Sequence, residues 1–432
     1  MLIQFRVGNY RSICEPQALS LVASADQSLS EANLIGQPHD KLRLVRQSVI
    51  YGPNAAGKST VLMAMEALRS LVFLSANLQE GQQLPWIVPF RLDAKSEQEP
   101  TVFEIIFEVE GVRYEYAISA TSSRVTHERF VAWPQGRAQR WFERTFDSEK
   151  GKDIWWFGPH FRGGHNQRIT YQAHTRSNAL FLSAAVQLNN EQLRPAFRWL
   201  TQQFIVVVPG KVTFNPTLTI DLLKSSEGNN RLIDFLRSAD IGIDRLNLEE
   251  SDGLFPQQIV PQMKAPFLPI FSPSASAQAG GQIQIKWGRV VTWHKGSDGK
   301  EISFDLGEES DGTRKLFELA GGWIKALDIG ATLCIDEIEL SLHPYITRLL
   351  VSLFRADSNK KNAQLIFTTH DTNLLDTDFL RRDQIWFVEK NKHSATELYS
   401  LLEYSPRKNE SLERGYLLGR YGAIPFLSEP SW

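Results

Sequence analysis

The residues best suited to chemistry lie near the N-terminus and match the pattern G-x-x-x-x-G-K-[ST]: Gly52-Pro53-Asn54-Ala55-Ala56-Gly57-Lys58-Ser59-Thr60. They stand between a predicted strand, Ser48–Tyr51, and a predicted helix. Such a loop turns successive backbone N–H groups towards phosphate oxygens at the positive end of a helix. We therefore predict a nucleotide site in which Lys58 reaches the β- and γ-phosphates and assists catalysis, and Ser59 ligates Mg²⁺. The other predicted contacts are Asn54, Ala55, Ala56, Gly57 and Thr60. The alternative is a glycine-containing turn that matches by chance.

Two adjacent carboxylates follow an apolar run later in the chain. The run Ala331–Ile335 is typical of a buried strand, and Asp336 and Glu337 come directly after it. A carboxylate at the C-terminal edge of such a strand can hold Mg²⁺, so we assign Asp336 to the metal, directly or through water. We assign Glu337 as the general base, because the attacking water needs a proton acceptor beside it. A strand that ends at a solvated acidic turn would show the same pattern.

Two more candidate positions lie on either side of the acidic pair. Ser310 and Gly312 precede a predicted amphipathic helix, Thr313–Leu327, and a serine with the following N–H groups can face an anion at a helix N-terminus. An ordinary N-cap has the same composition. His370 follows the apolar run Leu365–Thr368, and a lone histidine at a strand end is more often structural than catalytic.

The apolar pattern places these groups on an α/β architecture. Residues 1–170 are rich in predicted strands, including Leu2–Val7 and a hairpin in which Val102–Val109 turns into Val112–Ile118. Near the other end, short apolar runs separated by helical stretches predict a parallel sheet. Those runs are Thr332–Ile335, Leu365–Thr368 and Ile385–Val388.

We divide the chain into four segments. Residues 1–170 form an N-terminal lobe that carries the phosphate loop, and 171–262 read as a helical insert between two lobes. Residues 263–282 are rich in Pro, Ser, Ala and Gly, which predicts a flexible loop. Residues 283–432 form a C-terminal lobe with Ser310, the acidic pair and His370.

The bulk composition is that of a globular protein. The 432 residues are 42% hydrophobic and 22% charged, with a net charge of -2, so any nucleic-acid binding must come from a local patch. Two distant cysteines fit a reducing compartment. Neither a signal peptide nor a membrane-spanning run is predicted, which favours a cytoplasmic protein without membrane contact.

Taken together, the motifs resemble those of ABC-type ATPases. Asn54-Ala55-Ala56 before Gly57-Lys58-Ser59 resembles the loop G-x-N-x-[AS]-G-K-[ST] of the SMC, RecF and OLD ATPases. Asn9-Tyr10-Arg11-Ser12 resembles the N-[FY]-[RK]-S segment near the start of SMC and RecF-like proteins. The segment 414–426 looks like the tail of AAA-type ABC-like ATPases of bacterial anti-phage defence loci, of the RloA and AbiL kind, which are related to the PARIS ATPase.

The resemblance implies a P-loop fold with a mixed or parallel sheet flanked by helices, a strand-rich N-terminal lobe and a helical insert. It also implies that Ser310 and Gly312, in an S-x-G-x-[RK] signature, contact the γ-phosphate bound to another protomer. His370 would contact the γ-phosphate, and Arg11 would approach nucleotide phosphate. ATP and Mg²⁺ are the expected cofactors. ATP-sandwiched sites would make the protein a homodimer or a higher homo-oligomer.

By the same resemblance, the protein is expected to be an ATP-hydrolysing switch or sensor in anti-phage defence. Such proteins control an effector, often a nuclease, that is encoded nearby. OLD proteins continue into a TOPRIM nuclease domain, but the residues after His370 are too few for one. The effector is therefore expected to act in trans.

Two alternatives stay open. One is a RecF- or SMC-like repair ATPase that contacts DNA or RNA through basic and aromatic residues of 121–170, although a solvated sheet face has a similar composition. Those residues are Arg124, Arg129, Arg137, Arg140, Arg144, Lys150 and Lys152, with Trp133, Trp141, Trp155 and Trp156. The other is a scaffold that binds ATP without hydrolysing it, which the intact set of polar site residues disfavours.

Overall fold

The structure is a computed structural model that describes residues 1–37, 39–40, 42–208, 217–256, 268–269, 277–278, 282–406 and 410–425. The chain divides into two compact units. The first comprises Met1–Val212, Ala326–Ile338 and Leu350–Trp432, and the second comprises Thr213–Lys325 and Glu339–Leu349. Each unit is described by itself.

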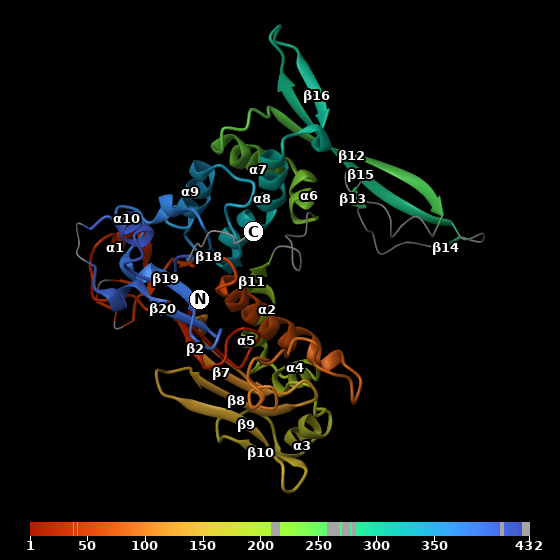
Figure 1. Cartoon of the computed structure of the whole chain (residues 1–432). Coiled ribbons are helices and arrows are strands. Elements are labelled where there is room, and N and C mark those ends of the chain that lie inside the picture. The colour runs from red at the N-terminus through yellow and green to blue at the C-terminus, as the bar shows by residue number, and fades with distance from the viewer. Residues whose placement is uncertain are drawn as a thin grey trace, which may run out of the picture. The chain divides into compact units, whose positions relative to one another are not determined.

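The first unit contains a seven-stranded antiparallel sheet in the order β10-β9-β8-β7-β6-β1-β2 (Figure 1). The predicted hairpin is confirmed, because β6 and β7 pair from Thr101↔Ala120 to Val109↔Val112. In β6 and β7 nearly every second residue is buried, as expected for a sheet with one covered face. Their bounds are β1 Leu2–Gly8, β2 Gln17–Ser20, β6 Thr101–Val109, β7 Val112–Ala120, β8 Val125–Trp133, β9 Gln139–Asp147 and β10 Lys152–Phe157.

The same unit contains a six-stranded sheet in the order β11-β17-β18-β5-β19-β20. The first five strands are parallel, which confirms the predicted parallel sheet, and β20 adds an antiparallel edge. β5, β17 and β18 are buried along their whole length, as parallel strands require. The bounds are β5 Gln47–Tyr51, β11 Phe204–Val207, β17 Thr332–Ile335, β18 Gln364–Thr368, β19 Ile385–Lys390 and β20 Thr396–Ser400.

Helix α2, Lys58–Leu74, packs in the core that joins the two sheets. Its buried Val61, Leu62 and Met65 belong to one apolar cluster that includes Phe103 of β6 and Ile366 of β18. With the turn that follows it, this helix is long and apolar enough to cross a membrane by length and composition alone, but half of that segment is buried inside the protein. Burial against two sheets accounts for its apolar character.

Shorter elements complete the first unit. They are α1 Ser30–Asn33, the pair β3 Leu34–Ile35 and β4 Leu44–Val45, α3 His165–Ala173, α4 Phe181–Gln187, α5 Arg194–Arg198 and α10 Leu412–Leu417. A π-helical turn, Trp199–Gln203, leads into β11. Short 3-10 turns lie at Ser75–Asn77, Thr372–Leu374, Arg382–Gln384 and Leu401–Tyr404.

The second unit combines helices with an antiparallel ribbon. Strand β15, Gln282–Lys295, pairs with β12, Arg245–Pro256, along twelve residues and also with β16, Glu301–Asp305. The short strands β13, Leu268–Pro269, and β14, Ala277–Gln278, pair with β15 too. The helices are α6 Thr217–Leu223, α7 Ser226–Ser238, the 3-10 turn Leu306–Glu308, α8 Asp311–Ile329 and α9 Pro344–Leu353. Helices α8 and α9 each have an end in the first unit.

The compact units do not follow the four predicted segments. The expected insert, 171–262, divides between them, because α4, α5 and β11 belong to the first unit whereas α6, α7 and β12 belong to the second. β11 pairs with β17 and so forms one edge of the six-stranded sheet, a strand that the sequence analysis did not predict. Most of the loop predicted at 263–282 lies outside the described residues.

Candidate functional site

The phosphate-loop motif connects β5 to α2, as the sequence predicts. Two positions have left-handed backbone, Ala55 with φ 62° and Gly57 with φ 116°. A Cβ at Gly57 would lie 2.6 Å from Cγ2 of Thr396 and still closer to its hydroxyl oxygen. The second glycine of the motif is therefore required both by its φ angle and by the neighbouring strand.

The loop presents its polar groups at the start of α2. Lys58 is buried, and its ammonium donates to the carbonyl oxygens of Gly52 at 2.8 Å and Pro53 at 3.3 Å. Ser59 and Thr60 are half-buried in the first helical turn, whereas Asn54 and Ala55 are exposed at the tip. The ammonium therefore lies against the carbonyl oxygens at the start of the loop, which leads into the N-terminus of α2, and a helix N-terminus favours an anionic ligand.

The acidic pair at the end of β17 is tied to β18 by one hydroxyl group. Thr368 Oγ1 donates to Asp336 Oδ1 at 2.6 Å and accepts from the backbone N–H of Glu337 at 2.8 Å. The N–H of Ile338 donates to the carbonyl oxygen of Thr368. Glu337 has a φ of 50°, a left-handed conformation that is uncommon for a residue with a side chain. The Thr368 bonds therefore hold Glu337 in a conformation that a free turn would rarely adopt.

His370 follows β18 and is exposed. Its loop is anchored on the neighbouring strand, because Tyr51 at the end of β5 donates its hydroxyl to the carbonyl oxygen of Asp371 at 2.9 Å. The next 3-10 turn is capped by the Asp371 side chain, which accepts from the N–H of Asn373 at 3.0 Å.

The sheet order brings three of these segments to one edge. β18 lies between β17 and β5, with Phe367 in register with both Ile335 and Val49. All three strands are parallel, so the phosphate loop, the acidic pair and His370 emerge at the same C-terminal edge of the first unit. Within the part of the chain that the structure describes, no group of three His, Cys, Asp or Glu residues could hold a metal ion. The oxygen donors of Ser59 and Asp336 suit Mg²⁺, which commonly takes its remaining ligands from phosphate and water.

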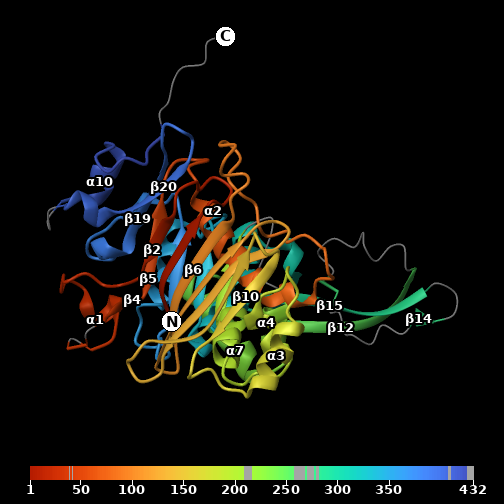
Figure 2. The same cartoon turned by 90° about the horizontal axis from the view of Figure 1, so that it is seen from below.

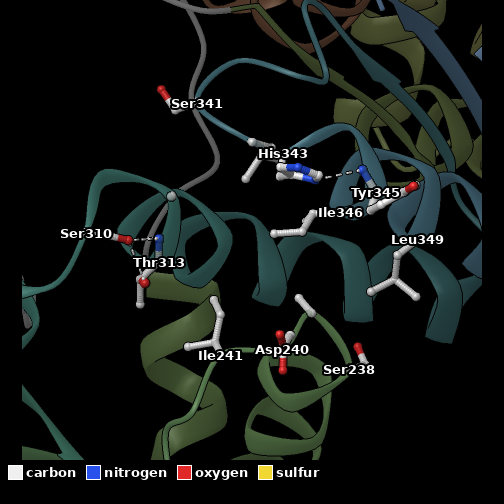
Figure 3. Close-up of a pocket in the computed structure, with 13 residues that line it drawn as sticks. Ser238, Asp240, Ile241, Ser310, Thr313, Ser341, His343, Tyr345, Ile346 and Leu349 are labelled. Atoms are coloured by element: carbon white, nitrogen blue, oxygen red, sulfur yellow. Dashed lines mark hydrogen bonds between the residues drawn. The ribbon is translucent and has the colours of Figure 1, made fainter. Parts of the chain in front are cut away.

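The signature residues lie in the second unit. Ser310 caps α8, because its hydroxyl accepts from the N–H of Thr313 at 3.1 Å, and Gly312 follows in the first turn. They line a cavity of about 630 Å³ together with the start of α9, where the N–H of Tyr345 donates to His343 Nδ1, and with residues at the end of α7 (Figure 3). Ser310 is thus the N-cap of α8, and the cavity is lined by the N-termini of both α8 and α9.

Arg11 lies on the flank of α2. Its backbone has a φ of 50°, its N–H donates to the carbonyl oxygen of Val88, and its Nε donates to Tyr10 Oη at 3.2 Å. Arg11 lines a cavity of about 130 Å³ with Glu66 and Trp86. The adjacent Ser12 donates its hydroxyl to Thr60 Oγ1 at 3.0 Å. The segment that carries Arg11 is therefore attached to the first turn of the phosphate-loop helix.

Sequence reasoning missed two positioning groups. Thr368 lies two residues before His370, and the parallel register would have placed it beside Asp336. Thr396 begins β20, is buried, and donates its hydroxyl to the carbonyl oxygen of Ala56 at 2.7 Å while lying 2.8 Å from Ser12 Oγ. No local pattern links Thr396 to the phosphate loop, because the two segments are 340 residues apart.

The basic and aromatic surface expected within 121–170 is largely neutralised. Arg144 is fully buried, with two nitrogens on Asp153 Oδ2 and a third on the carbonyl oxygen of Ala179. Four more of the predicted cations form ion pairs: Arg124 with Asp153, Arg129 with Glu115, Arg140 with Glu143, and Lys150 with Asp147. The expectation of Arg144 as a surface contact for nucleic acid is therefore wrong, and the paired cations offer little net positive charge.

Comparison with known proteins gives a family match. The sequence model described as "AAA domain, putative AbiEii toxin, Type IV TA system" matches residues 48–376. No curated protein sequence matches the chain. Similar solved structures include the SMC head domain from Thermotoga maritima, with 11% identity and a TM-score of 0.38, covering 92% of this chain and 98% of that chain. Another is the Smc head domain with an extended coiled coil bound to the C-terminal domain of ScpA, derived from Pyrococcus furiosus, with 12% identity, a TM-score of 0.34 and coverages of 97% and 98%. The family match spans the phosphate loop, the acidic pair and His370.

Proposed function

This chain belongs to the AAA-domain family of the AbiEii type, and we propose that it binds ATP with Mg²⁺ and hydrolyses the ATP to ADP and phosphate. The observation that carries the proposal is the shared sheet edge at which the phosphate loop, Asp336, Glu337 and His370 emerge. Thr368 orients the Asp336 carboxylate and holds the left-handed backbone of Glu337, an arrangement that a site for binding alone would not need.

Each residue has a role that its position supports. Lys58 and the N–H groups of the loop bind the phosphates, and Ser59 and Asp336 provide oxygen ligands for the metal. Mg²⁺, when bound, neutralises charge on the β- and γ-phosphates. Glu337 accepts a proton from the attacking water, and His370 donates a hydrogen bond to the γ-phosphate. Arg11 contributes positive charge from the flank of α2.

The test is ATP turnover, measured as phosphate release, with ATP binding measured separately. We expect Lys58→Ala to lose binding and Glu337→Gln to retain binding while turnover falls at least a hundredfold. Turnover by Glu337→Gln at the wild-type rate would remove Glu337 as the base. A wild-type protein that binds ATP without any turnover would instead support a scaffold.

We further propose that ATP closes two copies head to tail, with Ser310 and Gly312 of one copy facing the nucleotide of the other. The capped N-terminus of α8 supports this role, since helix N-termini favour anions. In sedimentation experiments, Glu337→Gln protein with ATP and Mg²⁺ should form a dimer or larger assembly. The same protein carrying Ser310→Arg should not. Equal assembly of both would contradict the head-to-tail arrangement.

The biological role that we propose is a cytoplasmic switch in anti-phage defence, of the RloA, AbiL and PARIS kind, which controls an effector supplied in trans. The family description, a toxin of a type IV toxin–antitoxin system, supports a role in such loci. Tagged Glu337→Gln protein, purified with ATP and Mg²⁺ from cells that carry the native neighbouring genes, should retain a stoichiometric protein encoded beside it. Nuclease-sensitive DNA without a protein partner would favour the repair ATPase instead.

A further inference from the structure

The tail segment that follows the nucleotide motifs has a defined place in the first unit. We call residues 410–425, its described part, the tail; they contain α10, Leu412–Leu417, and the turns after it, and lie beside β19 and β20 (Figure 2). Tyr416 is 8% exposed and Tyr421 is 1% exposed, although both belong to a terminal segment. The tail is therefore packed into the first unit rather than laid over its surface.

The tail aromatics reach the strand that leads into the phosphate loop. The ring of Tyr416 stacks on Phe387 of β19 at 5.5 Å and lies 5.6 Å from the ring of Tyr51 at the end of β5. Tyr421 stacks on the same Phe387 ring at 5.9 Å. Burial raises the pKa of Tyr416 to about 12, so its hydroxyl stays protonated and donates to the carbonyl oxygen of Ala423.

Two positions of the tail require glycine, because neighbouring atoms lie too close for a Cβ atom. A Cβ at Gly415 would lie 2.7 Å from the Tyr421 hydroxyl. Gly422 has a φ of 66°, and its Cβ would lie 2.7 Å from Glu389 Oε2, which already accepts from the N–H of Ala423 at 3.0 Å. The turn after α10 thus packs closely against β19 and is hydrogen-bonded to it, and a larger side chain at Gly422 would disturb this packing.

From this position the tail contacts the loop that carries His370. Thr372 donates its hydroxyl to Glu413 Oε1 on α10 at 2.7 Å. On the other side of the loop, Tyr51 donates to the carbonyl oxygen of Asp371 while its ring rests against Tyr416. The two residues after His370 are therefore each held by a group that touches or belongs to the tail.

We propose that Glu413 and Tyr416 are positioning residues that fix His370 relative to the phosphate loop. The inference rests on the proposed ATP hydrolysis. His370 is exposed, and its loop continues into a single 3-10 turn, Thr372–Leu374, whose first residue is the one that Glu413 contacts. Glu413 supports the loop through Thr372, and Tyr416 supports it through Tyr51.

The experiment compares turnover and ATP binding for variants of the whole chain. Glu413→Ala and Thr372→Val each remove the bond between the tail and the loop, and we expect kcat to fall roughly tenfold because small displacements of a reacting group are costly. ATP affinity should be unchanged, since neither residue belongs to the phosphate loop. Glu413→Gln keeps the acceptor oxygen and Thr372→Ser keeps the hydroxyl donor, so both variants should have a kcat close to that of the wild type.

A matched control separates positioning from tail stability. Glu410 also lies in the tail and accepts from the Tyr421 hydroxyl at 2.8 Å. Glu410→Ala should lower the thermal unfolding temperature without a comparable loss of kcat. Equal kcat losses for Glu410→Ala and Glu413→Ala would overturn the proposal, because a general loosening of the tail would then explain both.

A double variant tests whether the effect passes through His370. In a His370→Ala background, Glu413→Ala should cause no further loss of kcat. A full additional tenfold loss, or wild-type turnover by the single Glu413→Ala variant, would overturn the inference while leaving ATP hydrolysis intact. The proposed function would instead be overturned if the wild-type protein showed no ATP turnover, or only turnover that persists in Lys58→Ala. The two failures are therefore distinguishable.

Discussion

The hydroxyl group of Thr368 donates to the carboxylate of Asp336 across two neighbouring parallel strands, at 2.6 Å. The same oxygen accepts from the N–H of Glu337 at 2.8 Å. One side chain thereby orients the expected metal ligand and holds the backbone of the expected base. Support of this kind fixes a ligand's rotamer before the substrate arrives.

We expect Thr368→Val, which removes this hydroxyl at nearly constant volume, to lower kcat by roughly 10- to 100-fold. It should also raise the Mg²⁺ concentration needed for half-maximal turnover. Thr332→Val is the matched control, because Thr332 is buried at the other end of β17 and donates to Gln364 Oε1 at 3.1 Å. That variant should lose stability but keep its Mg²⁺ dependence, and an equal Mg²⁺ shift in both would argue against the role of Thr368.

Gly57→Ala should abolish ATP binding. The added methyl group would meet Thr396 in a backbone conformation, φ 116°, that L-residues rarely adopt. Gly136→Ala is the control, since Gly136 also has a positive φ, 72°, but its Cβ would meet no atom within 4 Å. Calorimetric titration with ATP should detect no binding to the first variant and wild-type affinity in the second.

Glu128→Ala should destabilise the first unit by on the order of 3 kcal/mol, because buried donors would be left without acceptors. The Glu128 carboxylate accepts from the N–H groups of Phe181 and Leu182 at the start of α4 and from the hydroxyl of Tyr116. Burial raises the pKa of Glu128, although Arg144 beside it acts in the opposite direction. Glu143→Ala is the comparison, because it removes a more exposed ion pair with Arg140 and should lower the free energy of unfolding by less than about 1 kcal/mol. Urea unfolding measures both losses. Equal losses would contradict the capping role.

The ion pair of Asp26 with Arg382 should make stability depend on pH at the acidic end. The N–H of Ser28 and the Arg382 guanidinium hold the pKa of Asp26 well below its usual range. A lowered folded-state pKa stabilises the fold above the unfolded pKa of about 3.9, and this contribution is lost as the pH falls through the folded value. The stability difference between wild type and Asp26→Asn, from urea unfolding, should therefore be largest at neutral pH and narrow below about pH 4. A difference that stays constant over this range would show that the carboxylate charge contributes nothing.

The outer face of the antiparallel sheet should not bind duplex DNA in a salt-sensitive manner. Of the seven basic residues predicted for this role within 121–170, five form ion pairs, and Arg144 among these five is buried. Arg137 and Lys152 are exposed and form no ion pair within the described residues. Fluorescence anisotropy with labelled duplex at low and high salt measures this directly. If the wild-type protein binds duplex DNA and the double variant Arg137→Ala/Lys152→Ala does not, the result would favour the repair ATPase hypothesis. Arg144→Ala is unsuitable as a test, because it removes a buried ion pair and should unfold the sheet.

The sequence alone determined the elements whose signals are local. The phosphate loop between β5 and α2, the acidic pair after β17 and the parallel strands follow from consecutive residues and from apolar runs of strand length. The predicted strand Thr332–Ile335 coincides with β17, and the predicted helix Thr313–Leu327 lies inside α8. Residue type and order suffice here, because backbone geometry within a few residues controls these elements.

Only the tertiary structure decided which distant groups support the site and which faces are buried. Thr396 meets the phosphate loop, and Glu413 meets the His370 loop, through strand order and tail packing that no local spacing encodes. Arg140 and Arg144 are four residues apart on one strand, but the register against β8 shifts at Trp141, so simple alternation does not assign their faces. Arg144 is therefore buried beside Asp153 while Arg140 stays exposed. A one-residue irregularity reassigns side chains to the opposite face of a sheet, and it is visible only once the strands are paired.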